Sequence, residues 1–167
     1  MHPARRTYLD KQSPAIFKSL SAVAVQIRAH ADDLGLSRRL LELVNIRVSQ
    51  LNGCGYCLQL HTARALAEGE TTHRLAVLSV WRETELFDAR ERAALMLAEG
   101  ATLMAGERVS DAEHAWISSV LSVDEISVLS WAAIAINAFN RVSVLSRHPV
   151  PAQPPVVTPA AVVPSTR

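Results

Sequence analysis

Apolar residues along most of this chain recur at the three- and four-residue spacing of an amphipathic helix, and no stretch alternates like a half-buried strand. Residues that favour helix ends, such as Ser13 before Pro14 and the Asn52–Gly53 pair, divide this pattern into segments. The pattern predicts seven helices, near residues 13–31, 37–52, 54–67, 71–81, 88–98, 110–120 and 122–145. The sequence therefore predicts an all-α fold of about six to seven helices.

Three of these apolar runs follow the same start signal. A capping residue stands before each run, and a glutamate stands three positions later, so that each side chain can accept a hydrogen bond from the backbone of the other residue. The pairs are Asp88 with Glu91, Ser110 with Glu113, and Ser122 with Glu125. These capping boxes are a second signal for helices, so the helical interpretation does not rest on apolar periodicity alone.

The ends of the chain differ from its centre. We expect an N-terminal arm over residues 1–12, a helical domain over residues 13–147, and a proline-rich tail over residues 148–167. Six of the eight prolines lie between Pro149 and Pro164. Because proline removes backbone donors and interrupts helices, we expect this tail to be disordered or loosely extended.

Composition narrows the classes of function. The 167 residues carry a formal net charge of +1, and the basic residues are scattered, so nothing indicates a nucleic-acid or anionic-membrane partner. No apolar run follows the first arginines, and the apolar stretch from Ile126 to Phe139 is short and interrupted by polar residues. We therefore expect a cytoplasmic protein. Two cysteines two residues apart close too small a loop to brace a fold, which leaves redox chemistry, metal binding or an inert role.

Cys54, Cys57 and His61 form the most informative pattern. On a helix of 100° per residue they occupy one face, and Cys57 and His61 are direct neighbours four positions apart. An imidazole beside a thiol can accept its proton and produce a thiolate. Both cysteines also fall in the first helical turn, where unpaired N–H groups and the positive end of the helix dipole favour negative charge. The pattern predicts an acidic thiol pair.

Glu42 is the fourth candidate, because it lies in a helix that is apolar on most sides. A short Asn52–Gly53 connection predicts an antiparallel helix pair. Glu42 lies some ten residues before that turn and His61 some eight after it, so the two side chains are expected at similar depth. A carboxylate there would orient the imidazole and raise its basicity.

These residues resemble the core motif of the AhpD-like alkylhydroperoxidase branch of the carboxymuconolactone decarboxylase family. The resemblance covers roughly Ser13 to Arg147 and rests on Cys-x-x-Cys-x-x-x-His with a glutamate twelve residues upstream. The matching residues are Arg47 through His61, Ala65, Gly69, Trp81–Arg82, Phe87, Glu91 through Leu95, and Asn137 through Arg141.

The resemblance implies a homo-oligomer, commonly a trimer or hexamer, that reduces hydroperoxides without a metal or flavin cofactor. It implies that Cys57 is the peroxidatic nucleophile, that Cys54 donates a proton and resolves the intermediate, and that His61 and Glu42 form a proton relay. It further implies an external dithiol or lipoyl-type reductant. The helix dipole alone favours Cys54 as the more acidic thiol, and the best-known members carry a histidine where this chain has Tyr56.

Other functions fit parts of the pattern. The pair could reduce protein disulfides of a peroxiredoxin partner, or Cys54, Cys57, His61 and Glu42 could serve a metal-binding or redox-sensing module. A non-catalytic helical scaffold is a further alternative. Tyr56 is interpreted as packing or a pocket wall. We expect ordinary surface positions for His30, His73, His114 and His148, and core or subunit contacts for Trp81, Trp116 and Trp131.

Overall fold

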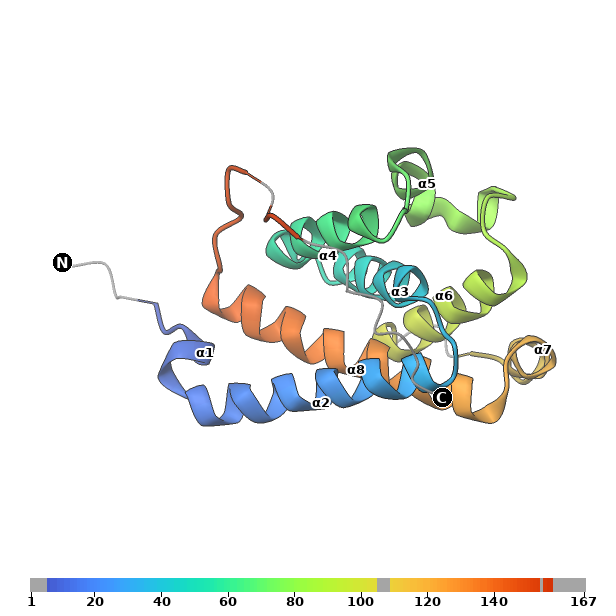
Figure 1. Cartoon of the computed structure of the whole chain (residues 1–167), viewed down its shortest axis with the longest axis horizontal. Helices are drawn as coiled ribbons and strands as arrows, with labels where there is room; N and C mark the ends of the chain where they lie inside the picture. The colour runs from blue at the N-terminus through green and yellow to red at the C-terminus, as the bar shows by residue number, and fades with distance from the viewer. Residues whose placement is uncertain (1–5, 105–108, 154, 158–167) are drawn as a thin grey trace, which may run out of the picture.

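The computed structural model describes residues 6–104, 109–153 and 155–157. This part of the chain contains eight α-helices, one short 3-10 helix and no strand, which confirms the all-α class (Figure 1). In chain order the elements are α1 Leu9–Gln12, α2 Pro14–Asp33, α3 Arg38–Leu51, α4 Gly55–Ala67, α5 Thr72–Val77, η1 Leu78–Glu83, α6 Ala89–Thr102, α7 Asp111–Val120 and α8 Val123–Ser146. The helix beyond the expected number is α1, which lies in the segment predicted to be an arm.

Helix starts follow the predicted capping chemistry. Asp88, Ser110 and Ser122 form complete capping boxes at the starts of α6, α7 and α8. Ser37 caps α3 through the backbone N–H of Leu40. Ser13 precedes α2 as predicted, but its side chain makes no capping hydrogen bond, so Pro14 at the first helical position provides the start signal there.

The single helix expected over residues 71–81 is instead two short pieces. Helix α5 ends at Val77, and the chain continues as a 3-10 helix that is kinked at Val80 (φ −119°, ψ 34°). Leu78 and Trp81 are nevertheless buried, because the 3-10 segment places both against the core. Apolar spacing therefore gave the burial correctly but not the continuity of the helix.

Helix α3 is the wall shared by the two halves of the core. One apolar cluster joins it to α2, α6, α7 and α8, and includes Leu41, Val44 and Val48. The other joins it to α4, η1 and α6, and includes Leu43 and Ile46. Because apolar residues pack on both sides of α3, its partly buried polar side chains, such as Glu42 and Arg47, need partners, and both find them on neighbouring helices.

Helices α2 and α8 lie side by side and antiparallel along one edge of the molecule (Figure 1). By length and composition α8 could cross a membrane, and half of its most apolar stretch is buried inside the molecule; a single helix of this kind is weak evidence for a membrane span. Trp131 of α8 is 54% exposed and Trp116 of α7 is 39% exposed, so the core alternative is wrong for both. Their role in subunit contacts, and the homo-oligomer itself, stay predictions.

The proline-rich tail is only partly described. Residues 148–153 follow α8 without regular structure and lie over the start of α4, where the Gln59 side chain donates to the Pro151 carbonyl at 2.8 Å. Val150 lies so close to Gly55 that a Cβ atom added at position 55 would be 3.0 Å from the Val150 side chain. The beginning of the tail is thus packed against the domain, whereas residues 154 and 158–167 lie outside the described residues.

A buried carboxylate ties α6 to α3 and η1. Glu99 accepts hydrogen bonds from the Arg47 Nε at 2.7 Å and from the Trp81 indole at 2.9 Å, and it forms an ion pair with Arg82. Burial alone would raise the pKa of the Glu99 carboxyl, but these donors outweigh it and hold that pKa below its ordinary value.

We therefore predict that Glu99→Gln lowers the free energy of unfolding at neutral pH by about 3 kcal/mol, because the buried guanidinium of Arg47 loses its counter-charge. The depressed pKa means that this contribution is complete above the ordinary carboxyl pKa of about 4.3 and is lost as the pH falls through the folded value. Urea denaturation at several pH values measures it. Glu85→Gln, at a fully exposed carboxylate, is the control; equal stability of the two variants at pH 7 would contradict this account.

Candidate active site

The turn between α3 and α4 aligns the two helices that carry the site. Gly53 adopts φ +64°, a conformation that favours glycine, and the backbone N–H of Cys54 donates to the Ser49 carbonyl at 3.0 Å. The Asn52 side chain donates to the side-chain oxygens of Asn137 and Asn140 of α8, each at 2.9 Å. The turn is thereby fixed both within the hairpin and to the helix that crosses it.

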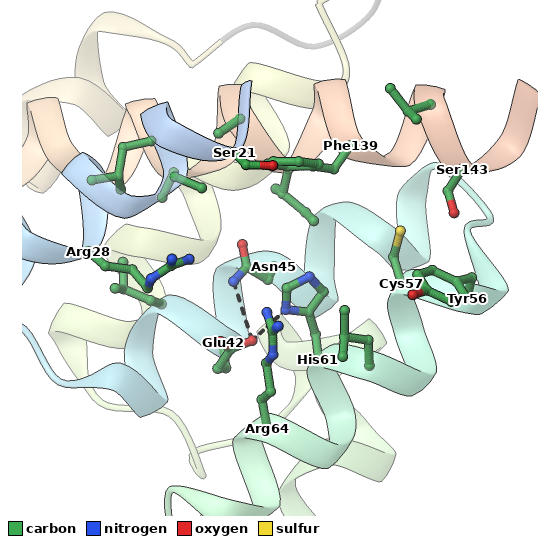
Figure 2. A pocket seen from close by; sticks show the side chains of 18 of the residues that line it. Ser21, Arg28, Glu42, Asn45, Tyr56, Cys57, His61, Arg64, Phe139 and Ser143 are labelled. Carbon is green, nitrogen blue, oxygen red and sulfur yellow. Dashed lines mark hydrogen bonds and ion pairs between the residues drawn. The ribbon is translucent and has the colours of Figure 1, made fainter. Parts of the chain in front are cut away.

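The hairpin brings Glu42 of α3 against His61 of α4, as predicted. The Glu42 Oε2 lies 2.6 Å from the His61 Nδ1 and also accepts from Asn45 at 3.3 Å (Figure 2). The two side chains are only 12% and 9% exposed. Because a carboxylate accepts, it favours the proton on Nδ1 and leaves Nε2 able to take a proton from another group.

Both cysteines lie at the start of α4, and both are buried thiols. Cys54 is the N-cap residue, and its sulfur accepts from the backbone N–H of Cys57 at 3.4 Å. Cys57 lies in the first turn, and its thiol as well as its backbone N–H favours negative charge on the sulfur of Cys54. The predicted grouping of the two sulfurs at a helix start is therefore confirmed.

The two thiols differ strongly in acidity. The Cys57 side chain, its backbone N–H and the Ser143 hydroxyl stabilise a Cys54 thiolate, and together they outweigh burial and lower the pKa of Cys54 to about 6. The same contact and burial raise the pKa of Cys57 far above its ordinary value. The acidic thiol is thus Cys54, as the helix dipole indicated.

Helix α8 supplies contacts that the sequence pattern did not reveal. Ser143 lines the same cavity as Cys57 and the same recess as Cys54, and its hydroxyl lowers the pKa of each thiol; the Asn140 amide likewise lowers the pKa of Cys57. Asn140 is fully buried, and its amide also donates to the Ser49 hydroxyl at 3.1 Å. Ser143 could have been found only as a polar position in the most apolar helix, where a buried polar group needs partners, whereas Asn140 also lies in the Asn137–Arg141 stretch of the family resemblance.

His148 is not the ordinary surface residue that we expected. Its Nδ1 lies 3.1 Å from the Ser143 hydroxyl and its Nε2 lies 3.1 Å from the Asp10 carboxylate of α1. Its ring stacks on Tyr8 and meets Tyr56 edge to face, with ring centroids 5.5 Å apart in each case. An imidazole thus lies against residue 56 although it comes from the segment after α8.

The two sulfurs face different spaces. Cys57, His61 and Glu42 line a cavity of about 450 Å³ between the α3–α4 hairpin and helices α2 and α8, within the usual range for ligand sites (Figure 2). Cys54 instead lines a separate recess beneath residues 147–150. Tyr56 lines both, which confirms its interpretation as a pocket wall. Within the described ranges no group of three or more His, Cys, Asp or Glu side chains is arranged to hold a metal ion.

Residues 14–100 match the sequence profile of the Carboxymuconolactone decarboxylase family. The chain belongs to this family. The chain is also 33% identical over 129 residues to the uncharacterized protein YdfG of Bacillus subtilis. The aligned region covers 71% of this chain and 86% of YdfG.

A solved structure agrees with this membership. A protein of unknown function from Agrobacterium tumefaciens, described as a candidate antioxidant defence protein AhpD, superimposes with a TM-score of 0.81 at 29% identity. The superposition covers 89% of this chain and 99% of that one. The fold is therefore AhpD-like. The family match includes Glu42, Cys54, Cys57 and His61 but ends before α8.

The contacts at the start of α4 predict which thiol ionises first. Ultraviolet titration of the reduced protein should show one thiolate forming at about pH 6, well below the ordinary cysteine pKa of about 8.5. Cys57→Ala should raise this value, because the S–H donor is lost, whereas Cys57→Ser keeps a hydroxyl donor and should raise it less. Retention of the acidic thiolate in Cys54→Ser would show that it belongs to Cys57 instead.

Proposed function

We propose that this protein is a dithiol-dependent hydroperoxide reductase in which Cys57 attacks the peroxide, Cys54 resolves the product, and His61 with Glu42 moves protons. The observation that carries the proposal is the placement of Cys57 and the Glu42–His61 pair in one cavity wall, with the acidic Cys54 hydrogen-bonded to Cys57. Membership of the family and the likeness to a candidate antioxidant protein support the same chemistry.

Cys57 keeps its proton in the resting protein, and the Glu42 contact leaves the Nε2 of His61 free, which supports a role for His61 as the proton acceptor for Cys57. In the first step the Cys57 thiol passes its proton to the His61 imidazole, and the Cys57 sulfur attacks the terminal oxygen of the hydroperoxide. An S–O bond forms and the O–O bond breaks. The leaving alkoxide takes the proton from the His61 imidazolium, which gives an alcohol and the sulfenic acid of Cys57. The peroxide gains the two electrons that the sulfur loses.

In the second step the Cys54 thiolate attacks the sulfur of the sulfenic acid. The S–O bond breaks, and the departing hydroxide leaves as water by taking a proton from the His61 imidazolium, which forms again when His61 takes up a proton from solvent. Glu42 stabilises that imidazolium through its 2.6 Å contact, as a carboxylate does for a catalytic histidine. An external dithiol then reduces the Cys54–Cys57 disulfide by exchange.

We predict that Cys57→Ser abolishes peroxide-dependent oxidation of an added dithiol, because the attacking sulfur is gone. Cys54→Ser should instead stop at the Cys57 sulfenic acid, which dimedone traps and mass spectrometry assigns to residue 57. Retained peroxidase activity in Cys57→Ser would refute the proposal. If the wild-type protein reduces a peroxiredoxin disulfide but not free peroxide, the alternative of a protein-disulfide reductase is correct.

The relay has its own test. His61→Gln should slow the oxidation of Cys57 by roughly 100-fold, the typical contribution of a general acid–base group. Glu42→Gln should have a smaller effect on the rate, because the imidazole keeps its place but loses the carboxylate that orients it. Stopped-flow rates from pH 5 to 9 measure both. If the wild-type protein and both variants had identical rates and pH profiles, His61 and Glu42 would have no part in the mechanism.

A further inference from the structure

The cavity that holds Cys57 is also lined by three arginines, which the thiol chemistry does not use. Arg28 comes from α2, Arg38 from the start of α3, and Arg64 from α4 one turn after His61. The rest of the wall is largely apolar and includes Phe17, Ile27, Leu41, Leu60, Ile136 and Phe139. A cavity with an apolar wall and a few charged groups is typical of a site for an amphipathic ligand.

The three guanidinium groups are not equally paired. Arg38 lies 2.6 Å from the Asp32 carboxylate, which neutralises it. Among the described residues, neither Arg28 nor Arg64 has a carboxylate within ion-pair distance, although both side chains are partly buried. The two acidic residues of the cavity wall are already engaged: Glu42 accepts from His61 and Asn45, and Asp10 lies 3.1 Å from His148. Arg28 and Arg64 therefore face a cavity whose carboxylates both have other partners.

The local electrostatics agree with this unbalanced charge. Burial, followed by the positive charges of Arg38 and Arg64, lowers the pKa of Arg28 below its ordinary value, and Glu42 and Asp32 offset this only in part. The cations repel one another in a partly desolvated place, where such repulsion is stronger than in bulk water. An anion bound between Arg28 and Arg64 would relieve it.

The arrangement along the cavity gives the orientation of a ligand. Figure 2 shows the guanidinium groups of Arg28 and Arg64 turned toward the same space, with His61 between them and Cys57. A guanidinium binds a carboxylate through two parallel hydrogen bonds. We propose that Arg28 and Arg64 form an acid-binding subsite, so that the substrates are organic hydroperoxides with a carboxylate on an apolar body. The apolar wall holds the body, and the peroxide reaches Cys57.

This inference names the substrate class of the proposed function, but binding tests it without any turnover. Calorimetry on the reduced protein should show that decanoate binds and that decanol, which has the same chain without the acid, binds at least about 10-fold more weakly. Arg28→Gln and Arg64→Gln should each weaken decanoate binding by about 10-fold and leave decanol binding unchanged. Arg64→Lys should be intermediate, because it keeps the charge but loses the two-pronged geometry.

Arg38→Gln is the matched control. It removes a guanidinium from the same cavity, but one that is already paired with Asp32, so it should change decanoate binding little. Equal binding of decanoate and decanol, or decanoate binding unaffected by both glutamine variants, would overturn the subsite. The subsite would also be overturned if Arg28→Gln and Arg64→Gln lost activity equally toward a carboxylated and an uncharged hydroperoxide, because the arginines would then only support Glu42. Selective decanoate binding without peroxidase activity would uphold the subsite and refute the proposed function.

Discussion

The hydrogen-bonded contact between Glu42 and His61 is the constraint on which the site depends. A carboxylate and an imidazole buried together are tolerated only when each satisfies the other, because an unpaired charge in this interior would be costly. Their contact requires α3 and α4 to pair in one register, with the turn at Gly53 and the amide of Asn52 held by α8. The same register places Cys57 one turn before His61, facing the cavity.

The start of α4 gives its two sulfurs different properties by position alone. Cys54, as the cap, receives the backbone N–H and the side-chain donors that stabilise negative charge, whereas Cys57 is itself one of those donors. The sulfur with the lower pKa therefore lies away from the main cavity, and the sulfur that faces the cavity keeps its proton. Under the proposed mechanism this division is useful, because Cys54 is already a thiolate and can act as the resolving nucleophile as soon as Cys57 is oxidised.

Local sequence signals predicted the parts of the fold that depend on neighbouring residues. The three capping boxes, the start of α4 and the Glu42–His61 contact follow from helix periodicity and one short turn. His148 and Ser143 could not be predicted in this way, because their role depends on how α8 crosses the hairpin. That crossing depends on how the apolar surfaces of the helices pack. The apolar pattern of the sequence is compatible with many helix–helix registers and does not select one of them. The 3-10 segment after Val77 was not predicted, because Leu78 and Trp81 remain buried across the kink and the apolar spacing therefore looks like that of a continuous helix.

The origin of the cavity walls suggests a division between chemistry and selectivity. Glu42, Cys54, Cys57 and His61 all belong to one hairpin, whose register is fixed by its own turn and by the apolar faces of α3. The opposite walls come from α2 and α8, and His148 approaches Tyr56 from beyond α8. Side chains such as Arg28 and Phe139 can therefore change without moving the four hairpin residues relative to one another. Under the proposed function, a fold built in this way can keep one thiol reaction while residues of α2 and α8, such as Arg28, act together with Arg64 of the hairpin to determine which molecule reaches the sulfur.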